Sequence, residues 1–180
     1  MKNDILKVLY DENQLKERVV ELGKLIENDY KDKDLVVIGV LKGCMFFMAD
    51  LVREIKLPLT IDFMVVSSYG ASTKSSGVVR IVKDLERDIQ GKDVLIVEDI
   101  IDTGLTLAYL MEVLNGRNPN SLRVVSLLDK PNRRKADVEV KYTGFQVPDE
   151  FVCGYGLDYN EIYRNLPFVC VLKPEIYENL

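Results

Sequence analysis

Three carboxylates and a turn rich in hydroxyl groups follow one apolar run near the middle of the chain. The run at residues 94–97 leads directly into Glu98 and Asp99, and Asp102 comes after two isoleucines. The next residues are Thr103, Gly104, Leu105 and Thr106. Acids can bind sugar hydroxyls and hold Mg²⁺ through oxygen ligands, and a turn that opens a helix can bind a phosphate. The pattern therefore predicts a site for a sugar phosphate together with Mg²⁺.

The elements around these residues place them where α/β proteins bind ligands. A short continuous apolar run is typical of a buried parallel strand, and ligands in open α/β sheets bind outside the carboxyl ends of the strands. The helical spacing after the turn predicts a helix from Thr103 whose N-terminus favours an anion. Each residue also has a plainer explanation when it is taken alone. Asp102 could be only an N-cap, and Glu98 with Asp99 could be a solvated strand end.

Strands and helices alternate along most of the chain, which predicts a parallel α/β architecture with no internal repeat and no linker. We expect helices at 12–30, 45–55 and 103–114. We expect strands at 35–41, 59–66, 78–82, 94–97 and 122–128, and short β segments around 138–142, 151–154 and 168–172. The small, polar segment 67–77 predicts a flexible loop. The whole chain, 1–180, is expected to form one domain, with a small hood built from its two ends.

Composition limits the classes of function. The 180 residues are 47% hydrophobic, and the net charge of −5 argues against a general nucleic-acid surface. No apolar run reaches the roughly 18–20 residues that a membrane span needs, and the first residues lack the apolar core of a signal peptide. Cys44, Cys153 and Cys170 show no C-x-x-C spacing, so we expect buried free thiols. These features together predict a cytoplasmic protein without a membrane or nucleic-acid partner.

The chain contains no histidine, which narrows the chemistry further. Catalysis by Ser-His-Asp or Cys-His groups is excluded within this chain, and so is a His-ligated zinc site. A metal must be held by oxygen ligands, which points to Mg²⁺ or Mn²⁺. Proton transfer must use Asp, Glu, Lys or Tyr.

Segment 97–104, VEDIIDTG, resembles the phosphoribosyl-pyrophosphate (PRPP) binding motif of the type I phosphoribosyltransferases. Four other segments resemble the bacterial hypoxanthine-guanine branch of that family: VLKG at 40–43, SSYG at 67–70, LLDKP at 127–131 and VCGYGLDYNEIYRNLP at 152–167. The resemblance implies the type I phosphoribosyltransferase fold, a mostly parallel central sheet flanked by helices with a small hood. It implies transfer of the phosphoribosyl group of PRPP to hypoxanthine or guanine in purine salvage. It also implies Mg²⁺ and a homodimer or homotetramer.

The resemblance also implies a role for individual residues. The phosphate and ribose of PRPP are expected on Glu98, Asp99, Asp102, Thr103, Gly104, Leu105 and Thr106. Pyrophosphate is expected on Lys42, Gly43 and Arg164, and the purine on Lys130, Phe151, Val152 and Asp158. The metal is expected on Glu98, Asp99 and Asp158, and Ser68 with Tyr69 is expected to close over PRPP as a lid. Asp102 is the expected catalytic acid or base at the purine N7.

Elementary chemistry supports two of these roles and qualifies a third. The Lys130 ammonium has only donors, so it can serve the 6-oxygen of hypoxanthine or guanine but not the amino group of adenine. The always-charged fork of Arg164 suits pyrophosphate. Some relatives carry a lysine where this chain has Leu105, so phosphate binding must rest on N–H groups and hydroxyls.

Two other functions stay open at this point. One is a regulatory protein on the same fold that binds nucleotides or RNA. The acidic balance, and the presence of Asp102, Lys130 and Phe151 together, argue against it. The other is a receiver-type α/β domain, but such a domain has its acid pair near the start of the chain, whereas the pair that follows an apolar run here is Glu98 with Asp99.

Overall fold

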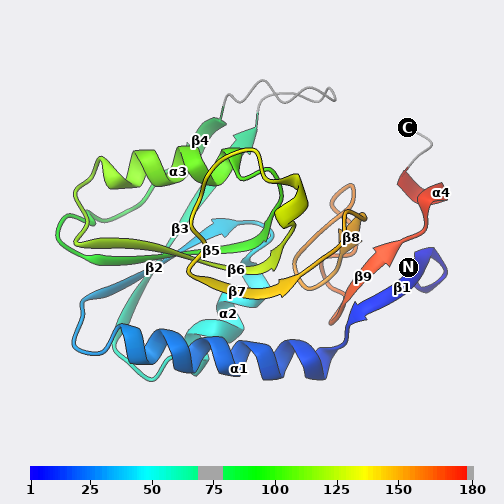
Figure 1. Ribbon diagram of the computed structural model, residues 1–180, viewed down its shortest axis with the longest axis horizontal. Coiled ribbons are helices and arrows are strands. Elements are labelled where there is room, and N and C mark those ends of the chain that lie inside the picture. The colour runs from blue at the N-terminus through cyan, green and yellow to red at the C-terminus, as the bar shows by residue number, and fades with distance from the viewer. Residues whose placement is uncertain (69–78, 178–180) are drawn as a thin grey trace.

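The computed structural model describes residues 1–68 and 79–177, and its larger sheet has six strands (Figure 1). Their order is β4-β3-β2-β5-β6-β7. They are β2 (Leu35–Leu41), β3 (Leu59–Ser68), β4 (Val79–Lys83), β5 (Asp93–Ile101), β6 (Ser121–Asp129) and β7 (Tyr142–Gln146). The five strands from β3 to β7 in this order pair in parallel, and the edge strand β4 is antiparallel to β3. The expected α/β architecture with a mostly parallel sheet is confirmed.

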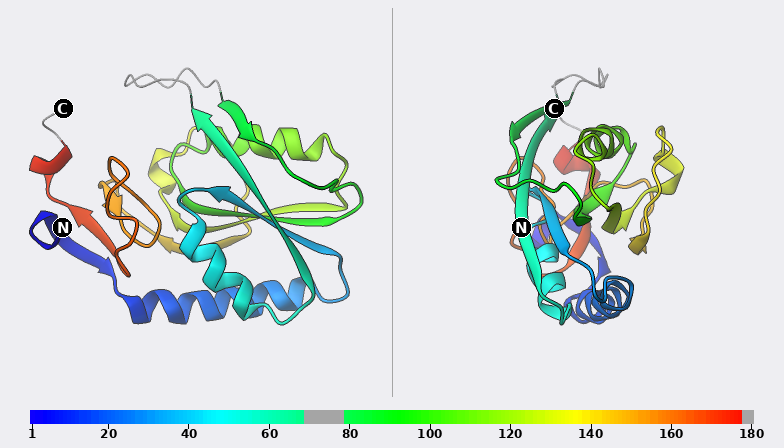
Figure 2. Two further views of the ribbon diagram at one scale, coloured as in Figure 1. Left: turned by 180° about the vertical axis from the view of Figure 1, so that it is seen from behind. Right: turned by 90° about the vertical axis from the view of Figure 1, so that its left-hand side faces the viewer.

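Helices cover both faces of this sheet, as the views from two directions show (Figure 2). Leu95 and Val97 of β5 pack in one core with helices α1 (Glu12–Asp29) and α2 (Met45–Glu54). Val94 and Ile96 point to the other face and pack with α3 (Leu105–Asn115). The central strand is apolar on both faces because it is buried on both, as parallel sheets require. A capping box between Asp11 and Gln14 opens α1.

A second, three-stranded antiparallel sheet lies beside one end of the large sheet (Figure 1). Its order is β1-β9-β8, with β1 (Ile5–Tyr10), β8 (Val152–Cys153) and β9 (Val169–Leu172). Cys153 and Cys170 stand directly opposite each other in β8 and β9. Both thiols and that of Cys44 are free and buried, as expected, and burial raises the pKa of all three. The remaining elements are the short helices η1 (Lys2–Asp4), η2 (Pro131–Arg133) and α4 (Pro174–Tyr177).

Several boundaries differ from the sequence prediction. Strand β1 was not predicted as a strand, and segment 138–140, predicted as β, is not a strand. Val138 and Val140 alternate because they pack as a loop against the α3 core. Strand β5 continues past residue 97 to Ile101, because β6 runs beside it as far as the pair Ile101 and Asp129. Helix α3 begins at Leu105 and not at Thr103.

Most of the predicted loop at 67–77 lies outside the described residues, whereas Ser67 and Ser68 belong to β3. None of the helices in the described part of the chain is both long and apolar enough to cross a lipid bilayer.

Candidate functional site

Glu98 and Asp99 lie in the carboxyl half of β5, after the last residue of that strand that pairs with β2. The pairing of β2 with β5 ends at Gly39 and Val97, so the chain after β2 is free to turn over the acids. Glu98 is buried on the α3 side, whereas Asp99 lies on the α2 side against Gly43. A Cβ atom at Gly43 would lie only 1.5 Å from Asp99 Oδ2, so this close approach requires glycine.

Burial shifts both carboxyl groups toward their protonated forms. It raises the pKa of Glu98 well above its ordinary value, and the neighbouring Asp99 charge adds to the effect. Burial also raises the pKa of Asp99 to about 6, although hydrogen bonds from its own backbone and from Ile100 N–H oppose the shift. Two adjacent acids with raised pKa values favour a cation that would keep them ionised.

The turn from Asp102 to Thr106 surrounds a hollow of about 210 Å³ at the start of α3. Its polar lining consists of Glu98, Asp102, Thr103, Gly104 and Thr106. Gly104 has a φ of +79° and precedes the first helical residue, Leu105. The free N–H groups of the first helical turn therefore lie beside the hollow, which is a common geometry for binding a phosphate.

Lys130 follows β6 directly and is buried. Its ammonium donates a hydrogen bond of 2.8 Å to the backbone oxygen of Glu150, the residue before Phe151. The Phe151 ring is partly exposed, stacks on Tyr177 at 5.1 Å and meets Tyr159 edge-on at 5.3 Å. The structure thus brings together Lys130, Phe151 and the neighbouring Val152 of β8, as the purine prediction requires.

The predicted pyrophosphate residues also meet. A Cβ atom at Gly156 would lie 2.0 Å from the backbone oxygen of Gly43, so segment 154–166 lies directly against the turn at 42–43. Arg164 Nη1 donates to the Gly156 oxygen at 2.8 Å, which anchors the arginine beside that turn. Lys42 forms an ion pair of 2.9 Å with Glu161 of the same segment. The peptide bond between Leu41 and Lys42, directly before this turn, is cis.

Asp158 lies on this segment and is already paired. Arg164 Nη2 contacts Asp158 Oδ1 at 2.7 Å, and the Glu161 N–H donates to Asp158 Oδ2 at 2.9 Å. The described residues contain no group of three Asp, Glu, His or Cys side chains that could hold a metal ion. The three predicted metal ligands therefore do not form one cluster, because Glu98 and Asp99 point to opposite faces of β5 and Asp158 lies on segment 154–166.

Sequence reasoning missed Arg133, which contacts the predicted catalytic acid. Its Nε donates to Asp102 Oδ1 at 2.5 Å, and its Nη1 donates to Asp149 Oδ1 at 3.0 Å. The residues from Lys130 to Asp137 appeared in the sequence only as a basic loop with a proline. No local pattern in this loop indicated that Arg133 would contact Asp102, because the fold of η2 over the end of β5 brings the two together.

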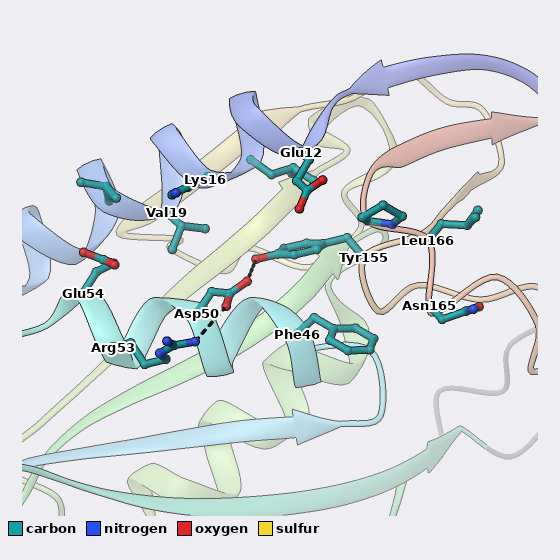
Figure 3. A pocket seen from close by; sticks show the side chains of 13 residues that line it. Glu12, Lys16, Val19, Phe46, Asp50, Arg53, Glu54, Tyr155, Asn165 and Leu166 are labelled. Carbon is teal, nitrogen blue, oxygen red and sulfur yellow. Dashed lines mark hydrogen bonds and ion pairs between the residues drawn. The ribbon is translucent and has the colours of Figure 1, made fainter.

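A larger hollow of about 580 Å³ lies between α1, α2 and segment 155–167, and none of the predicted site residues lines it (Figure 3). The Tyr155 hydroxyl donates to Asp50 Oδ2 at 2.6 Å across this hollow, and Asp50 also faces Arg53 (Figure 3). The hydrogen bond ties the residue before Gly156 to α2. This hollow therefore borders the segment that supports the pyrophosphate turn, but it does not contain the predicted chemistry.

The predicted lid is the one part of the site that cannot be placed. Ser68 is the last residue of β3, and Tyr69 lies outside the described residues. The closing role of this pair stays a prediction from the sequence.

Known proteins resemble the chain over nearly its whole length. A model of the phosphoribosyl transferase domain matches residues 7–160. A hypoxanthine-guanine phosphoribosyltransferase of Bacillus subtilis is 55% identical over 179 residues, which are 99% of each protein. A crystal structure of a hypoxanthine phosphoribosyltransferase from Staphylococcus aureus is also 55% identical and has a TM-score of 0.97, covering 99% of this chain and 97% of that one. A Trypanosoma cruzi hypoxanthine phosphoribosyltransferase mutant, in a ternary substrates complex, is 42% identical, with a TM-score of 0.92 over 97% of this chain and 99% of that one. The chain therefore belongs to the phosphoribosyltransferase family.

Proposed function

We propose that this protein transfers the 5-phosphoribosyl group of PRPP to hypoxanthine or guanine, releasing pyrophosphate and forming inosine or guanosine monophosphate. The observation that carries the proposal is the buried Lys130 ammonium beside Phe151 and Val152. A group with donors alone, held at the backbone of the residue before Phe151, suits a purine with an oxygen at position 6. Adenine would present an amino group there and leave donors unpaired, which a buried site tolerates poorly.

The sugar phosphate is assigned to the turn and the acids. The 5-phosphate binds in the hollow at the start of α3, on the hydroxyls of Thr103 and Thr106 and the N–H groups of the first helical turn. The ribose hydroxyls bind at Glu98 and Asp99. Leu105 adds no charge here, so backbone dipoles and hydroxyls supply the attraction for the phosphate.

Mg²⁺ is part of this proposal, and the donor set fits it. Mg²⁺ is usually bound by one or two carboxylates together with substrate oxygens, so a single acid of this set can suffice on the protein side. Burial raises the pKa of both acids, and a cation beside them would lower it again by favouring the ionised carboxylates. Asp158 would approach from the facing segment. When bound, the ion neutralises negative charge on the pyrophosphate oxygens.

The chain's own side chains account for the rest of the transfer. Arg164 and the turn at 42–43 hold the leaving pyrophosphate, and Arg164 supplies a fixed positive charge as that group departs. The ribose C1 gains positive character, and the purine nitrogen attacks it from the opposite face and inverts the centre. Asp102, next to the phosphate turn, accepts or steadies the proton at the purine N7.

A direct test measures conversion of each purine base by the purified protein with PRPP and Mg²⁺, separated by chromatography. Hypoxanthine and guanine should yield their monophosphates, and adenine should yield none above background. Efficient conversion of adenine, or no conversion of any base, would refute the proposal. The sequence left a regulatory RNA-binding function open, but no feature of the site favours it.

Three broader expectations belong to the same proposal. The whole chain acts as one phosphoribosyltransferase domain, with the small sheet as its hood. The three free thiols support a cytoplasmic location, where cysteines stay reduced. A homodimer or homotetramer is the assembly that the family resemblance implies.

A further inference from the structure

Arg133 connects Asp102, expected at the purine N7, with the loop beside Lys130, expected at the neighbouring 6-oxygen. Its Nε donates to Asp102 Oδ1 at 2.5 Å, and its Nη1 donates to both oxygens of Asp149 at 3.0 and 3.3 Å. Asp149 lies 4.0 Å from the Lys130 ammonium, which itself donates to the oxygen of Glu150. One planar guanidinium therefore spans the distance from the acid expected at N7 to the loop expected at the 6-oxygen.

The contact with Asp102 constrains that carboxylate in a specific way. The two residues lie on different elements, since Asp102 follows β5 and Arg133 ends η2. Both side chains are nearly half exposed, so without a partner the Asp102 carboxylate would rotate freely. The guanidinium engages Oδ1, and Asp102 also lines the hollow next to the phosphate turn. Holding one carboxylate oxygen fixes where the other one points.

We propose that Arg133 is a positioning residue that holds Asp102 in the orientation needed at the purine N7. The role rests on the proposed function, because it has meaning only if Asp102 acts on a bound purine. Arginine suits this role better than lysine, because its rigid fork can serve Asp102 and Asp149 at the same time. Lysine would supply one point charge and could satisfy only one of the two carboxylates.

If Arg133 positions Asp102, its loss should change kcat but leave the KM for PRPP nearly unchanged. Arg133→Gln should lower kcat about tenfold or more, because a misplaced catalytic group acts mainly on the transition state. The KM for PRPP should stay near the wild-type value, since the other described residues expected to bind PRPP form no hydrogen bond or ion pair with Arg133. Arg133→Lys should recover part of the lost kcat, because it restores the charge beside Asp102 but not the fork.

The matched control is Lys135→Gln, which removes the same charge from an exposed side chain two residues along the same loop. It should keep kcat within about twofold of wild type, as exposed substitutions generally do. Thermal unfolding of each variant, followed by circular dichroism, shows whether the fold is intact. A loss of kcat in Lys135→Gln equal to that in Arg133→Gln would mean that only the net charge of the loop matters, and would overturn the proposal.

A double-mutant cycle gives the decisive measurement. If Arg133 acts through Asp102, then Arg133→Gln should lower kcat in the wild type but have little further effect in Asp102→Asn. Equal factors in both backgrounds, or a wild-type kcat in Arg133→Gln, would refute the positioning role. Failure of the proposed function looks different, because then the wild-type protein itself would convert neither hypoxanthine nor guanine.

Discussion

Substitution of Asp99 by asparagine should change how the stability of the free protein depends on pH. Burial raises the pKa of Asp99 to about 6, above the ordinary value of 3.8. Between these two values the folded state binds more protons than the unfolded state, so the free energy of unfolding falls as pH rises through this window. The loss is complete above about pH 6. Asparagine stays neutral throughout and nearly preserves the shape, so this loss should disappear.

The size of the effect follows from the pKa difference. A shift of about two units corresponds to about 3 kcal/mol, since each unit is worth about 1.4 kcal/mol. Asp99 is only partly buried as a residue, and screening by water reduces this figure to about 1–2 kcal/mol. Removing the Asp99 charge also relieves Glu98, whose pKa that charge helps to raise, and this acts in the same direction. Asp99→Asn should therefore match wild type near pH 4 and be more stable at pH 7.

Urea unfolding of both proteins at several pH values in chelator measures the difference directly. Carboxylates other than Glu98 titrate alike in both proteins and cancel in the difference. Asp137→Asn is the control, because Asp137 is exposed and its substitution should leave the pH dependence unchanged. A stability difference between Asp99→Asn and wild type that is the same at pH 4 and pH 7 would refute the burial argument.

Three further predictions concern activity. Asp102→Asn should lower kcat by about 10²-fold, because an acid–base group is lost, and should largely keep the affinity for PRPP. Steady-state rates at saturating PRPP test this. A rate within about threefold of wild type would reduce Asp102 to a structural residue. Lys130→Met should lower kcat/KM for hypoxanthine by about 10²-fold, since the buried 6-oxygen loses its donor. Steady-state rates with hypoxanthine measure this, and an unchanged kcat/KM would contradict the role of Lys130. Chelation of divalent metal should abolish transfer and added Mg²⁺ should restore it, whereas full activity in excess chelator would exclude the metal from the reaction.

Short-range patterns in the sequence were enough to locate the strands that carry the site. The apolar run before Glu98 and the helical spacing after Thr106 both correspond to real elements. The end of β5 could not be predicted, because it depends on how far β6 runs beside it. Alternation at Val138 and Val140 gave a false strand, because a loop that packs on a helix can show the same alternation.

The missed contacts share a physical cause. Arg133 meets Asp102 only because the turn after β6 folds back over the end of β5, and no local pattern encodes such a meeting. The same holds for Gly156, whose glycine requirement comes from the backbone of Gly43, far away in the sequence. Sequence alone therefore predicted the types of side chain in the site, and tertiary structure was needed to show which of them touch.

The three buried cysteines can report local opening of the protein, because each thiol reacts only when its surroundings open. Cys153 and Cys170 face each other in the small sheet, whereas Cys44 lies in the core beneath α2. Burial raises the pKa of Cys153 to about 12 and that of Cys170 to about 11, so an alkylating reagent meets almost no thiolate while the sheet is closed. The rate at which each thiol is trapped thus reports how often its own surroundings open. Comparing Cys153 and Cys170 with Cys44 would distinguish a hood that opens by itself from a molecule that unfolds as one unit, without any engineered label.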